Sequence, residues 1–500
     1  MKATPLLTGW TCRHLGDTAP GRPVTLPHDA MLAEPRTALS AGGVNTGWYE
    51  GYDYEYQRTL TVPESELSDT HILEFEGVYH NAEVWLNGQK AAFRPYGYTN
   101  FYVDCAPFLR AGDNELRVIA RNADQPNSRW YSGAGLYRPV QLWTAGEKHI
   151  LLNGVRIRTV SLEPAVVEIR VRTSAPGTVQ LMAEGLPSVQ QESDGEAVFT
   201  LTIDNARLWT PETPNLYRCR VQFEDDEVTE TFGVRTVSWG KNGFTLNGER
   251  IIIQGACIHH DNGLLGAVCD PDAVARKVRL LKETGYNAIR SAHNPCSKAL
   301  LEECDRHWYI HKTEYDYVPY FAEWWRQDLN DMVEKDYNHP CVVLYSTGNE
   351  VSETAQPRGI ALTKEMTDFL HGLDDSRPVT CGVNIFFNFL SSIGFGVYSD
   401  EKAKKEAEKA EKAKAKGKAV KKKSVGSKFF NDLAGLLGDE FMKRGATLHG
   451  CDVKTRDAFA NMDIAGYNYG IYRYKHDLKK YPQRLILGSE TFCNDAYKFR

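Results

Sequence analysis

Two glutamates, Glu350 and Glu490, each come directly after a run of mostly apolar residues. The first run, 342–349, reads Val-Val-Leu-Tyr-Ser-Thr-Gly-Asn, and the second, 485–489, reads Leu-Ile-Leu-Gly-Ser. Hydrolysis of a glycosidic bond needs two carboxyl groups, one to protonate the leaving oxygen and one to attack the sugar or activate water. A mechanism that retains the anomeric configuration requires about 5–5.5 Å between the two groups. The pair therefore predicts a glycosidase, if the fold brings these two strand ends together.

The segments around these glutamates alternate between strand-like and helix-like patterns. Ile251–Ala256 is predicted to be a buried strand, Val274–Gly285 a helix, and 287–290 a strand again. Seven or eight such β/α units predict a (β/α)₈ TIM barrel over residues 238–500, whose chemistry stands at the carboxyl ends of the strands. The remaining expected elements are helices 297–305, 321–337 and 360–373 and strands 342–346, 379–383, 464–467 and 485–488.

The first 237 residues show instead the alternation of polar and apolar residues that is typical of β-strands. Residues 1–150 contain short runs such as 54–62 and 82–88, the latter ending in an Asn-Gly pair that favours a hairpin. Repeated short strands without helical stretches predict an N-terminal β jelly-roll sandwich. Residues 151–237 continue the alternation over a length that suits an immunoglobulin-like β-sandwich. The predicted fold is therefore multidomain, with the TIM barrel last.

The composition of the chain bears on which partners it binds and on the compartment in which it works. The net charge of −6 and the pI near 6.2 argue against a nucleic-acid partner. The 11 cysteines include no Cys-x-x-Cys pair, which predicts mostly buried thiols in a reducing compartment. We recognise no signal peptide, and no run approaches the roughly 18 apolar residues of a membrane span. We therefore expect a cytoplasmic protein that does not bind membranes.

A lysine- and glutamate-rich segment at about 400–425 interrupts the barrel pattern. Residues 401–423 contain 11 Lys and four Glu, with pairs four residues apart and no apolar stripe. A helix without an apolar face cannot pack into a core. We interpret the segment as a solvated insertion between two barrel units, and the alternative is a nucleic-acid or anionic-surface role.

Several short sequence motifs occur in order along the chain. They are Gly-Trp-Tyr at 47–49, Gly-Ala-Gly-Leu-Tyr-Arg-Pro at 133–139, Phe-Gly-Val-Arg at 232–235, Gly-Ala-Cys-Ile-His-His-Asp at 255–261, Asn-Ala-Ile-Arg-Ser-Ala-His-Asn-Pro at 287–295, Gly-Asn-Glu at 348–350 and Gly-Ser-Glu at 488–490. With these motifs the chain resembles glycoside hydrolase family 2, the β-galactosidase/β-glucuronidase group, over essentially its whole length.

The resemblance implies roles for the residues at the strand ends. Glu350 would be the general acid/base, Glu490 the nucleophile, and Asn349 the group that holds the 2-hydroxyl of the sugar. A contact with that hydroxyl strengthens in the oxocarbenium-like transition state, so an amide beside the acid is physically reasonable. We expect the pKa of Glu350 to be raised and Glu490 to stay ionised.

Further candidates for substrate binding come from the same comparison and from their places after strands. His293 resembles the glycone-contacting histidine of the family, with a capping role as the alternative. The adjacent His259 and His260, with Asp261, could suggest a metal site, but neighbouring side chains diverge, so we favour substrate contact by His259 and no metal. The other candidates are Asn468, Tyr469 and Tyr472 after the strand 464–467, and Arg129 and Trp130, which could reach the barrel mouth from the first domain.

The chain departs from the family pattern in two places. Between the expected helices 297–305 and 321–337 there is no convincing strand, apart from a short remnant at 308–310. The sequence also stops at Arg500, soon after Glu490, so we expect an incomplete barrel. We expect no cofactor, because the flavin of some bacterial relatives is bound through regions that this chain lacks.

These observations predict a retaining exo-β-glycosidase that releases a terminal β-linked galactose or glucuronic acid. The alternative is a catalytically inactive, carbohydrate-binding remnant of the same family, and a third possibility is a structural β-sandwich adhesin. The expected partner is a carbohydrate substrate, with homo-oligomerisation possible as in other family members.

Overall fold

The computed structural model describes residues 1–125, 127–307, 310–314, 323–351, 353–395, 435–493 and 495. These residues form two compact units, and each is described by itself. Of these residues, the first unit comprises 1–237 and 245–343, which include the two N-terminal sandwiches, and the second comprises 238–244 and those from Leu344 onward. The charged stretch 401–423 lies outside the described residues, so its interpretation stays a prediction.

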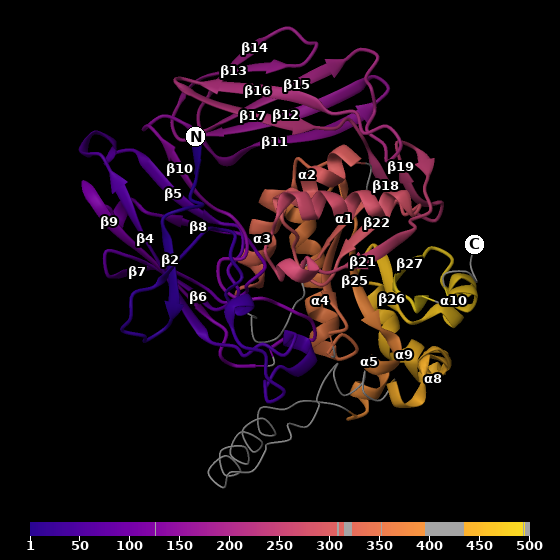
Figure 1. Ribbon diagram of the computed structural model, residues 1–500. Coiled ribbons are helices and arrows are strands. Elements are labelled where there is room, and N and C mark those ends of the chain that lie inside the picture. Colours follow the sequence, from indigo (N-terminus) through magenta and orange to yellow (C-terminus); the bar gives the residue numbers. More distant parts are fainter. Residues whose placement is uncertain are drawn as a thin grey trace. The chain divides into compact units, whose positions relative to one another are not determined.

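The N-terminal region folds into two antiparallel sheets (Figure 1), with strand orders β1-β10-β5-β8 and β3-β2-β4-β9-β6-β7. The predicted Asn-Gly hairpin is confirmed, since Asn87 and Gly88 join β6 to β7 with φ of 49° and 77°. Positive φ at both positions is what a two-residue type I′ turn requires. The strands are β1 Lys2–Pro5, β2 Trp10–His14, β3 Arg22–Val24, β4 Asp53–Val62, β5 Thr70–Phe75, β6 Ala82–Leu86, β7 Gln89–Arg94, β8 Phe101–Asp104, β9 Gly112–Arg121 and β10 Val140–Ala145.

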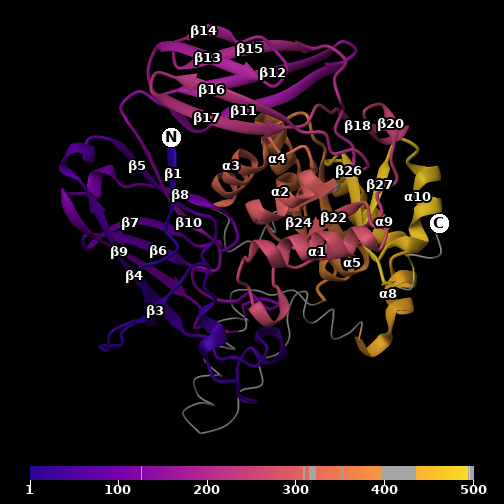
Figure 2. The same ribbon diagram turned by 45° about the horizontal axis from the view of Figure 1, so that its top comes forward.

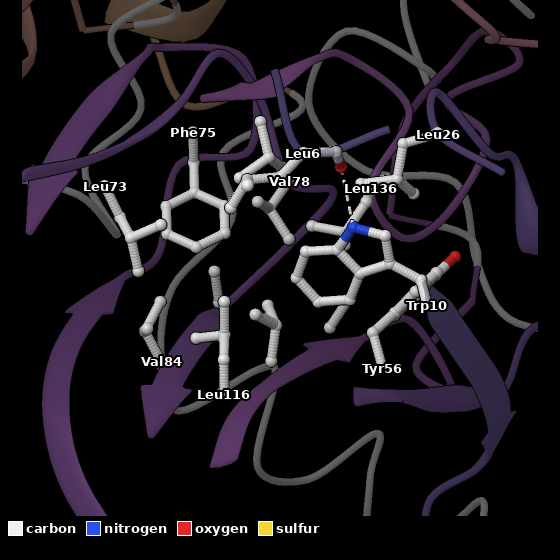
Figure 3. Close-up of a cluster of buried hydrophobic side chains, with 14 of the residues drawn as sticks. Leu6, Trp10, Leu26, Tyr56, Leu73, Phe75, Val78, Val84, Leu116 and Leu136 are labelled. Atoms are coloured by element: carbon white, nitrogen blue, oxygen red, sulfur yellow. Dashed lines mark hydrogen bonds between the residues drawn. The ribbon is translucent and has the colours of Figure 1, made fainter. Parts of the chain in front are cut away.

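The core of this sandwich consists of aliphatic and aromatic side chains contributed by both sheets (Figure 3). Trp10 is buried at its centre and donates its indole N–H to the carbonyl oxygen of Leu6 at 2.7 Å. The single polar atom of this large side chain is therefore satisfied within the core. Phe75 of β5 stacks on Phe101 of β8 with ring centroids 5.0 Å apart.

The second sandwich packs the sheet β11-β12-β15 against the sheet β14-β13-β16-β17 (Figure 2). Alternate residues of β12 and β16 point into the core, as the alternation in the sequence predicts. Val167, Val221 and Phe223 are among the side chains with no measurable exposure. The strands are β11 Ile150–Leu162, β12 Ala165–Thr173, β13 Gly177–Ala183, β14 Val189–Ser193, β15 Glu196–Ile203, β16 Tyr217–Phe223 and β17 Asp226–Phe232.

The first unit also contains the start of the β/α series, in which β21, β22 and β23 pair in parallel. Helix α1 begins after Asp270, whose side chain accepts the backbone N–H of Ala273 at 2.8 Å, and Pro271 occupies its first turn. The elements are β20 Glu249–Arg250, β21 Gly255–Ile258, α1 Pro271–Glu283, β22 Ala288–Ser291, α2 Lys298–His307, β23 Ile310–Glu314 and α3 Trp325–Asp336. Two short strands before them, β18 Val237–Gly240 and β19 Gly243–Leu246, belong partly to the second unit.

The expectation that a strand is missing after α2 was wrong. Residues Ile310–Glu314 form β23, which pairs in parallel with β22 so that Ile289 lies opposite His311. The sequence Ile-His-Lys-Thr-Glu contains one strongly apolar residue. Strand formation here depends on pairing with a neighbouring strand, which residue types report weakly.

The predicted buried strand 251–256 was also misplaced. The ladder begins only at Gly255, and Ile252 is 68% exposed. The side chain of Asn287 explains the shift, because it hydrogen-bonds to the backbone just before β21. It accepts from the N–H of Gln254 at 2.8 Å and donates to the carbonyl of Ile252 at 3.0 Å. An amide side chain therefore takes the place of strand pairing before β21.

The second unit continues the series, with β24, β25, β26 and β27 paired in parallel. Its core lies around β25, β26, α5 and α9 and includes Val383, Phe387 and Tyr467. The strands expected at 342–346, 379–383, 464–467 and 485–488 are confirmed. The elements are β24 Val342–Asn349, α4 Pro357–Leu373, β25 Val379–Asn384, α5 Ile385–Ser392, α8 Asp439–Gly445, α9 His449–Phe459, β26 Ile464–Asn468, α10 Tyr474–Lys480 and β27 Leu485–Glu490, of which α8 to β27 are coloured yellow in Figure 1.

Short 3₁₀ helices occupy some of the connections. They are η1 Ala30–Ala33, η2 Gly43–Thr46, η3 Glu64–Glu66, η4 Ala106–Phe108, η5 Gly263–Leu265 and η7 Ile471–Arg473.

Within the first unit, the motif Phe-Gly-Val-Arg at 232–235 joins the second sandwich to the β/α series. Arg235 donates to the carbonyl oxygens of Pro340 at 2.9 Å and Val342 at 2.7 Å, and is buried. A Cβ on Gly233 would lie 2.8 Å from the Cβ of Pro340, so only glycine permits this approach. The motif is therefore structural and does not take part in chemistry.

Within the second unit, Asp374 ties β24 to the loop between α4 and β25. It accepts hydrogen bonds from Tyr345 Oη at 2.9 Å and from both the backbone and the hydroxyl of Ser376, and it pairs with Arg377. Burial alone would raise the pKa of Asp374, but the Arg377 guanidinium and the Ser376 donors outweigh it and lower the pKa to about 2.

We expect Asp374→Asn to destabilise the protein at neutral pH. A folded-state pKa below the unfolded value of about 3.9 contributes stability that is present above about pH 4 and is lost as the pH falls toward 2. The contribution is about 2 kcal/mol at pH 7. Thermal unfolding midpoints of both proteins at pH 7 and near pH 3 should show a gap that narrows in acid. An equal gap at both pH values would contradict this assignment.

Candidate active site

The ends of β24 to β27 place polar side chains in a row within the second unit. In the parallel ladder, Asn384 at the end of β25 lies opposite Asn468 at the end of β26, and Asn468 lies opposite Glu490 at the end of β27. Glu350 directly follows β24, and its backbone N–H donates to the carbonyl of Gly382 on β25 at 2.7 Å. The two predicted carboxyls therefore belong to one ladder, with β25 and β26 between them. We call this set the carboxylate row: Asn349, Glu350, Asn384, Asn468, Tyr469 and Glu490.

Glu350 is held by two amide side chains. Asn384 donates from Nδ2 to Glu350 Oε1 at 2.8 Å, and Asn468 donates from Nδ2 to the same oxygen at 3.4 Å. Asn468 also donates to Asn349 Oδ1 at 2.9 Å. Only 7% of Glu350 is exposed, so its orientation is set by these donors with little competition from solvent.

Glu490 has a donor of a different kind. Tyr469 donates its phenolic O–H to Glu490 Oε2 at 2.7 Å, and the backbone N–H of Tyr469 donates to the carbonyl of Glu490 at 2.9 Å. The ring of Tyr469 packs on that of Phe492 with centroids 4.8 Å apart. Side chain and backbone of one residue thus hold the end of β27.

Two residues of the row have a left-handed backbone. Glu350 and Tyr469, which directly follow β24 and β26, have φ of 53° and 57°. In an extended strand, consecutive side chains point to opposite faces. The turn in the backbone lets Asn468 and Tyr469, although adjacent in sequence, each contact a carboxylate of the row.

The structure places Tyr472 differently from its two neighbours in the prediction. Its hydroxyl donates to Glu440 Oε1 of α8 at 2.8 Å, and 37% of the residue is exposed. Of the three residues predicted after β26, Asn468 and Tyr469 therefore contact the predicted catalytic carboxyls directly, whereas Tyr472 bonds to α8.

A second set of predicted residues meets within the first unit. The ring of Trp130 lies 5.2 Å from that of His259 and 5.4 Å from that of His293, centroid to centroid. The two histidine rings are 5.5 Å apart and nearly perpendicular. His259 follows β21 and His293 follows β22, so a loop of the first sandwich reaches the carboxyl ends of these strands. Arg129, half buried, precedes Trp130 in the same loop.

His260 lies behind this aromatic cluster. Its Nε2 faces the carbonyl oxygen of Ser132 at 3.1 Å, which assigns the ring proton to Nε2, and its ring packs on Tyr98 at 5.1 Å. Burial, and then the nearby Arg138 guanidinium, lower the pKa of His260 to about 3. Among the residues that the structure describes, no three His, Cys, Asp or Glu side chains are grouped so that they could hold a metal ion.

The motif Gly-Ala-Gly-Leu-Tyr-Arg-Pro at 133–139 contacts residues beside this cluster. Arg138, with 1% exposure, donates to the carbonyls of Tyr98 at 2.8 Å and Pro295 at 2.9 Å. These bonds join the first sandwich to the loop that follows His293. Arg138 and His260 also line a small pocket whose other residues include Lys277 and Asn294.

The sequence reasoning missed Asn384, which directly contacts the predicted acid. The signal was available, since Asn384 follows an apolar strand in the same way as Glu350 and Glu490. Tyr98 was also missed. It accepts the indole N–H of Trp130 at 3.0 Å, and no strand-end pattern points to it.

Cysteine burial agrees with expectation, because nine of the 11 cysteines are buried, Cys257 and Cys493 being exposed, and none is in a disulfide. The compartment and the oligomeric state stay predictions. No helix in the described part of the chain is long and apolar enough to cross a membrane.

Comparison with known proteins identifies relatives of each segment in turn. Residues 24–156 match the description "Glycosyl hydrolase 2 galactose-binding domain-like", and residues 154–235 match "Glycosyl hydrolases family 2". Residues 237–320 and 313–434 match "Glycosyl hydrolases family 2, TIM barrel domain". These matches confirm the predicted fold class of jelly-roll-like, immunoglobulin-like and TIM barrel domains, while the boundaries at 150 and 237 stay predictions.

Individual relatives carry two different names. A β-galactosidase from Bacteroides ovatus is 35% identical, over 74% of this chain and 53% of the relative, and a putative β-glucuronidase from Formosa agariphila is 31% identical, over 72% and 37%. The chain thus spans about half or less of the length of these curated relatives. A crystal structure of a family 2 glycosyl hydrolase from Bacteroides cellulosilyticus covers 100% of this chain with a TM-score of 0.79 and 28% identity, and 64% of that protein is matched.

We expect His260 to remain neutral between about pH 5 and pH 8, because its pKa lies near 3. In protein labelled with ¹³C at histidine Cε1, the His260 resonance, assigned by its absence in His260→Gln, should not titrate. His371 is the internal control. Its bond to Asp463 at 2.7 Å raises its pKa above the usual value, so it should titrate. Titration of His260 above pH 5 would contradict the assigned tautomer and burial.

Proposed function

Since the chain belongs to glycoside hydrolase family 2, we propose that it carries the catalytic carboxyls of a retaining exo-β-glycosidase. Glu350 is the proposed acid/base and Glu490 the proposed nucleophile. The observation that carries the proposal is the carboxylate row, in which two carboxyls at the ends of one parallel ladder have different hydrogen-bond donors.

In the first step, Glu350 donates a proton to the glycosidic oxygen while Glu490 attacks the anomeric carbon. The leaving group departs with that proton, and the sugar becomes covalently bound to Glu490. In the second step, the ionised Glu350 removes a proton from water, which attacks the anomeric carbon and releases Glu490. Two inversions give net retention.

The donors support this division of roles. Both amides bond to Glu350 Oε1, which favours Oε2 as the oxygen that carries the transferable proton. Tyr469 donates to Glu490 Oε2, which stabilises the ionised form that a nucleophile requires. The Tyr469 bond also fixes the carboxylate plane, so that Oε1 of Glu490 is the proposed attacking atom.

Asn349 is the proposed contact for the 2-hydroxyl of the sugar. Its Oδ1 accepts from Asn468 at 2.9 Å, which fixes the rotation of the amide and the direction of its Nδ2 donor. A hydrogen bond to the 2-hydroxyl gains strength as positive charge develops on the sugar ring.

Within the first unit, the cluster of Trp130, His259 and His293 is a proposed sugar-binding site. An indole and two imidazoles in contact offer both a stacking face and hydrogen-bonding nitrogens, a combination suited to a pyranose. Arg129 and Tyr472 stay candidates from sequence alone.

The proposed glycone is a terminal β-linked galactose or glucuronic acid, because the similar proteins carry both names. A panel of nitrophenyl β-galactoside, β-glucuronide, β-mannoside and β-glucoside, tested on this protein, distinguishes these sugars.

We expect Glu350→Gln and Glu490→Gln each to reduce release of nitrophenol by at least about 10³-fold. Azide should restore turnover of both alanine variants, with the product a β-glycosyl azide from Glu350→Ala and an α-glycosyl azide from Glu490→Ala. Glu353→Gln, three residues beyond Glu350, is the matched control. Activity retained in either Gln variant would exclude the assigned pair, and sugar binding in calorimetry without turnover by the wild type would favour the inactive remnant.

We expect Tyr469→Phe to lower kcat by roughly 10- to 10²-fold, because it removes one hydrogen bond to a charged group at the nucleophile. Tyr481→Phe is the control, since that hydroxyl bonds to Asp452 of α9 at 3.0 Å. The two variants should have similar thermal midpoints. An equal loss of activity in both would indicate a general structural effect.

A further inference from the structure

We propose that Asn384 is a positioning residue, which holds Glu350 in the orientation of a proton donor and selects the oxygen that carries the proton. The inference rests on the proposed role of Glu350 as acid/base. Asn384 would act only through Glu350 and would not touch the substrate.

The amide orientation of Asn384 is fixed by two bonds of opposite kind. Its Oδ1 accepts the backbone N–H of Phe387 at 3.1 Å, as the N-cap of α5, and its Nδ2 donates to Glu350 Oε1 at 2.8 Å. A flipped amide would set a donor against the N–H and an acceptor against the carboxylate. Because the helix cap requires the oxygen on one side, the N–H must face Glu350.

Burial shields the bond from Asn384 to Glu350 from solvent. Asn384 is 1% exposed, and the same is true of Asn468, which donates to the same oxygen of Glu350. Water therefore competes little for Oε1, and the two amides leave the proton to Oε2.

The first turn of α5 also holds the chain that follows Glu350. Asn388, one turn beyond Asn384, donates to the carbonyl of Asn384 at 3.1 Å and accepts the backbone N–H of Ala355 at 3.2 Å. Together with the bond from Glu350 N–H to the carbonyl of Gly382, these contacts attach both the backbone and the side chain of Glu350 to β25 and α5.

Such support is needed because Glu350 has a left-handed backbone, with φ of 53°. A non-glycine residue keeps this conformation only where its surroundings determine it. The bond from Asn384 also affects protonation, since a donor to a carboxylate favours its ionised form. Its removal should therefore make Glu350 hold its proton to higher pH.

The test compares Asn384→Asp, Asn384→Ser and the wild type, each assayed for kcat/KM across pH. Asp and Ser both retain an oxygen that can cap α5, but neither donates the amide N–H to Glu350. The alkaline limb of the profile reports loss of the proton from the acid. We expect it to move upward by about one pH unit or more in Asn384→Asp, where a like charge is added, and by less in Asn384→Ser.

The leaving group gives a second readout. Loss of activity should be greater for a methyl or phenyl glycoside, which needs the acid, than for a dinitrophenyl glycoside, which does not. Asn461→Asp is the control, because this amide donates to the carbonyl of Ile360 at 2.9 Å on α4. It should leave the limb and the leaving-group dependence unchanged.

An alkaline limb that stays in place in both Asn384 variants, or a uniform loss for all leaving groups, would overturn the inference. If Asn384→Asp does not fold, the pH profile of Asn384→Ser still tests the inference. Failure of the proposed function is separate, because it appears as activity retained in Glu350→Gln. An inactive Glu350→Gln with unmoved limbs in the Asn384 variants would reject only the positioning role.

Discussion

The parallel ladder of β24 to β27 is the constraint on which the rest of the site depends. Its hydrogen bonds align the carboxyl ends of strands that are far apart in the sequence, so that Asn384, Asn468 and Glu490 stand opposite one another in register. Apart from the exposed Gly488 of β27, the residues of these strands are buried or half-buried, which opposes a slip that would move these side chains away. The polar ends then need only local contacts to become an ordered network.

The sequence motifs that carry the family resemblance fall into two groups: those that supply the candidate catalytic side chains and those that hold the structure together. Gly-Asn-Glu and Gly-Ser-Glu supply the carboxyls of the row, whereas the buried arginines Arg138 and Arg235 donate to backbone carbonyls and hold domains of the first unit together. A guanidinium satisfies several carbonyls at once, which suits a junction where two backbones meet without regular pairing. Motif matches alone do not separate these two roles, but the bonding partners do.

Sequence patterns predicted the domain series, the strands of the second unit and the places of Glu350 and Glu490 at strand ends, because apolar runs and period-two alternation are local properties. They failed where a contact is tertiary. Strand β23 depends on pairing with β22, and the start of β21 depends on the side chain of Asn287. Tyr472, which was expected to join Asn468 and Tyr469, bonds to α8 instead. Trp130, by contrast, does meet His293, as the expectation that it could reach the strand ends requires. Asn384 also stands at a strand end, but no role in the site was predicted for it.

The left-handed residues after β24 and β26 have a consequence for directed evolution. At these positions the backbone itself disfavours β-branched replacements, and Asn468 and Tyr469 bond to the two carboxylates from adjacent positions, so random substitution there would disturb the orientation of both carboxylates together. Trp130, by contrast, lies in a loop outside the strands. For the proposed glycosidase, a library aimed at new sugar preferences would therefore retain the strand ends and diversify the loop.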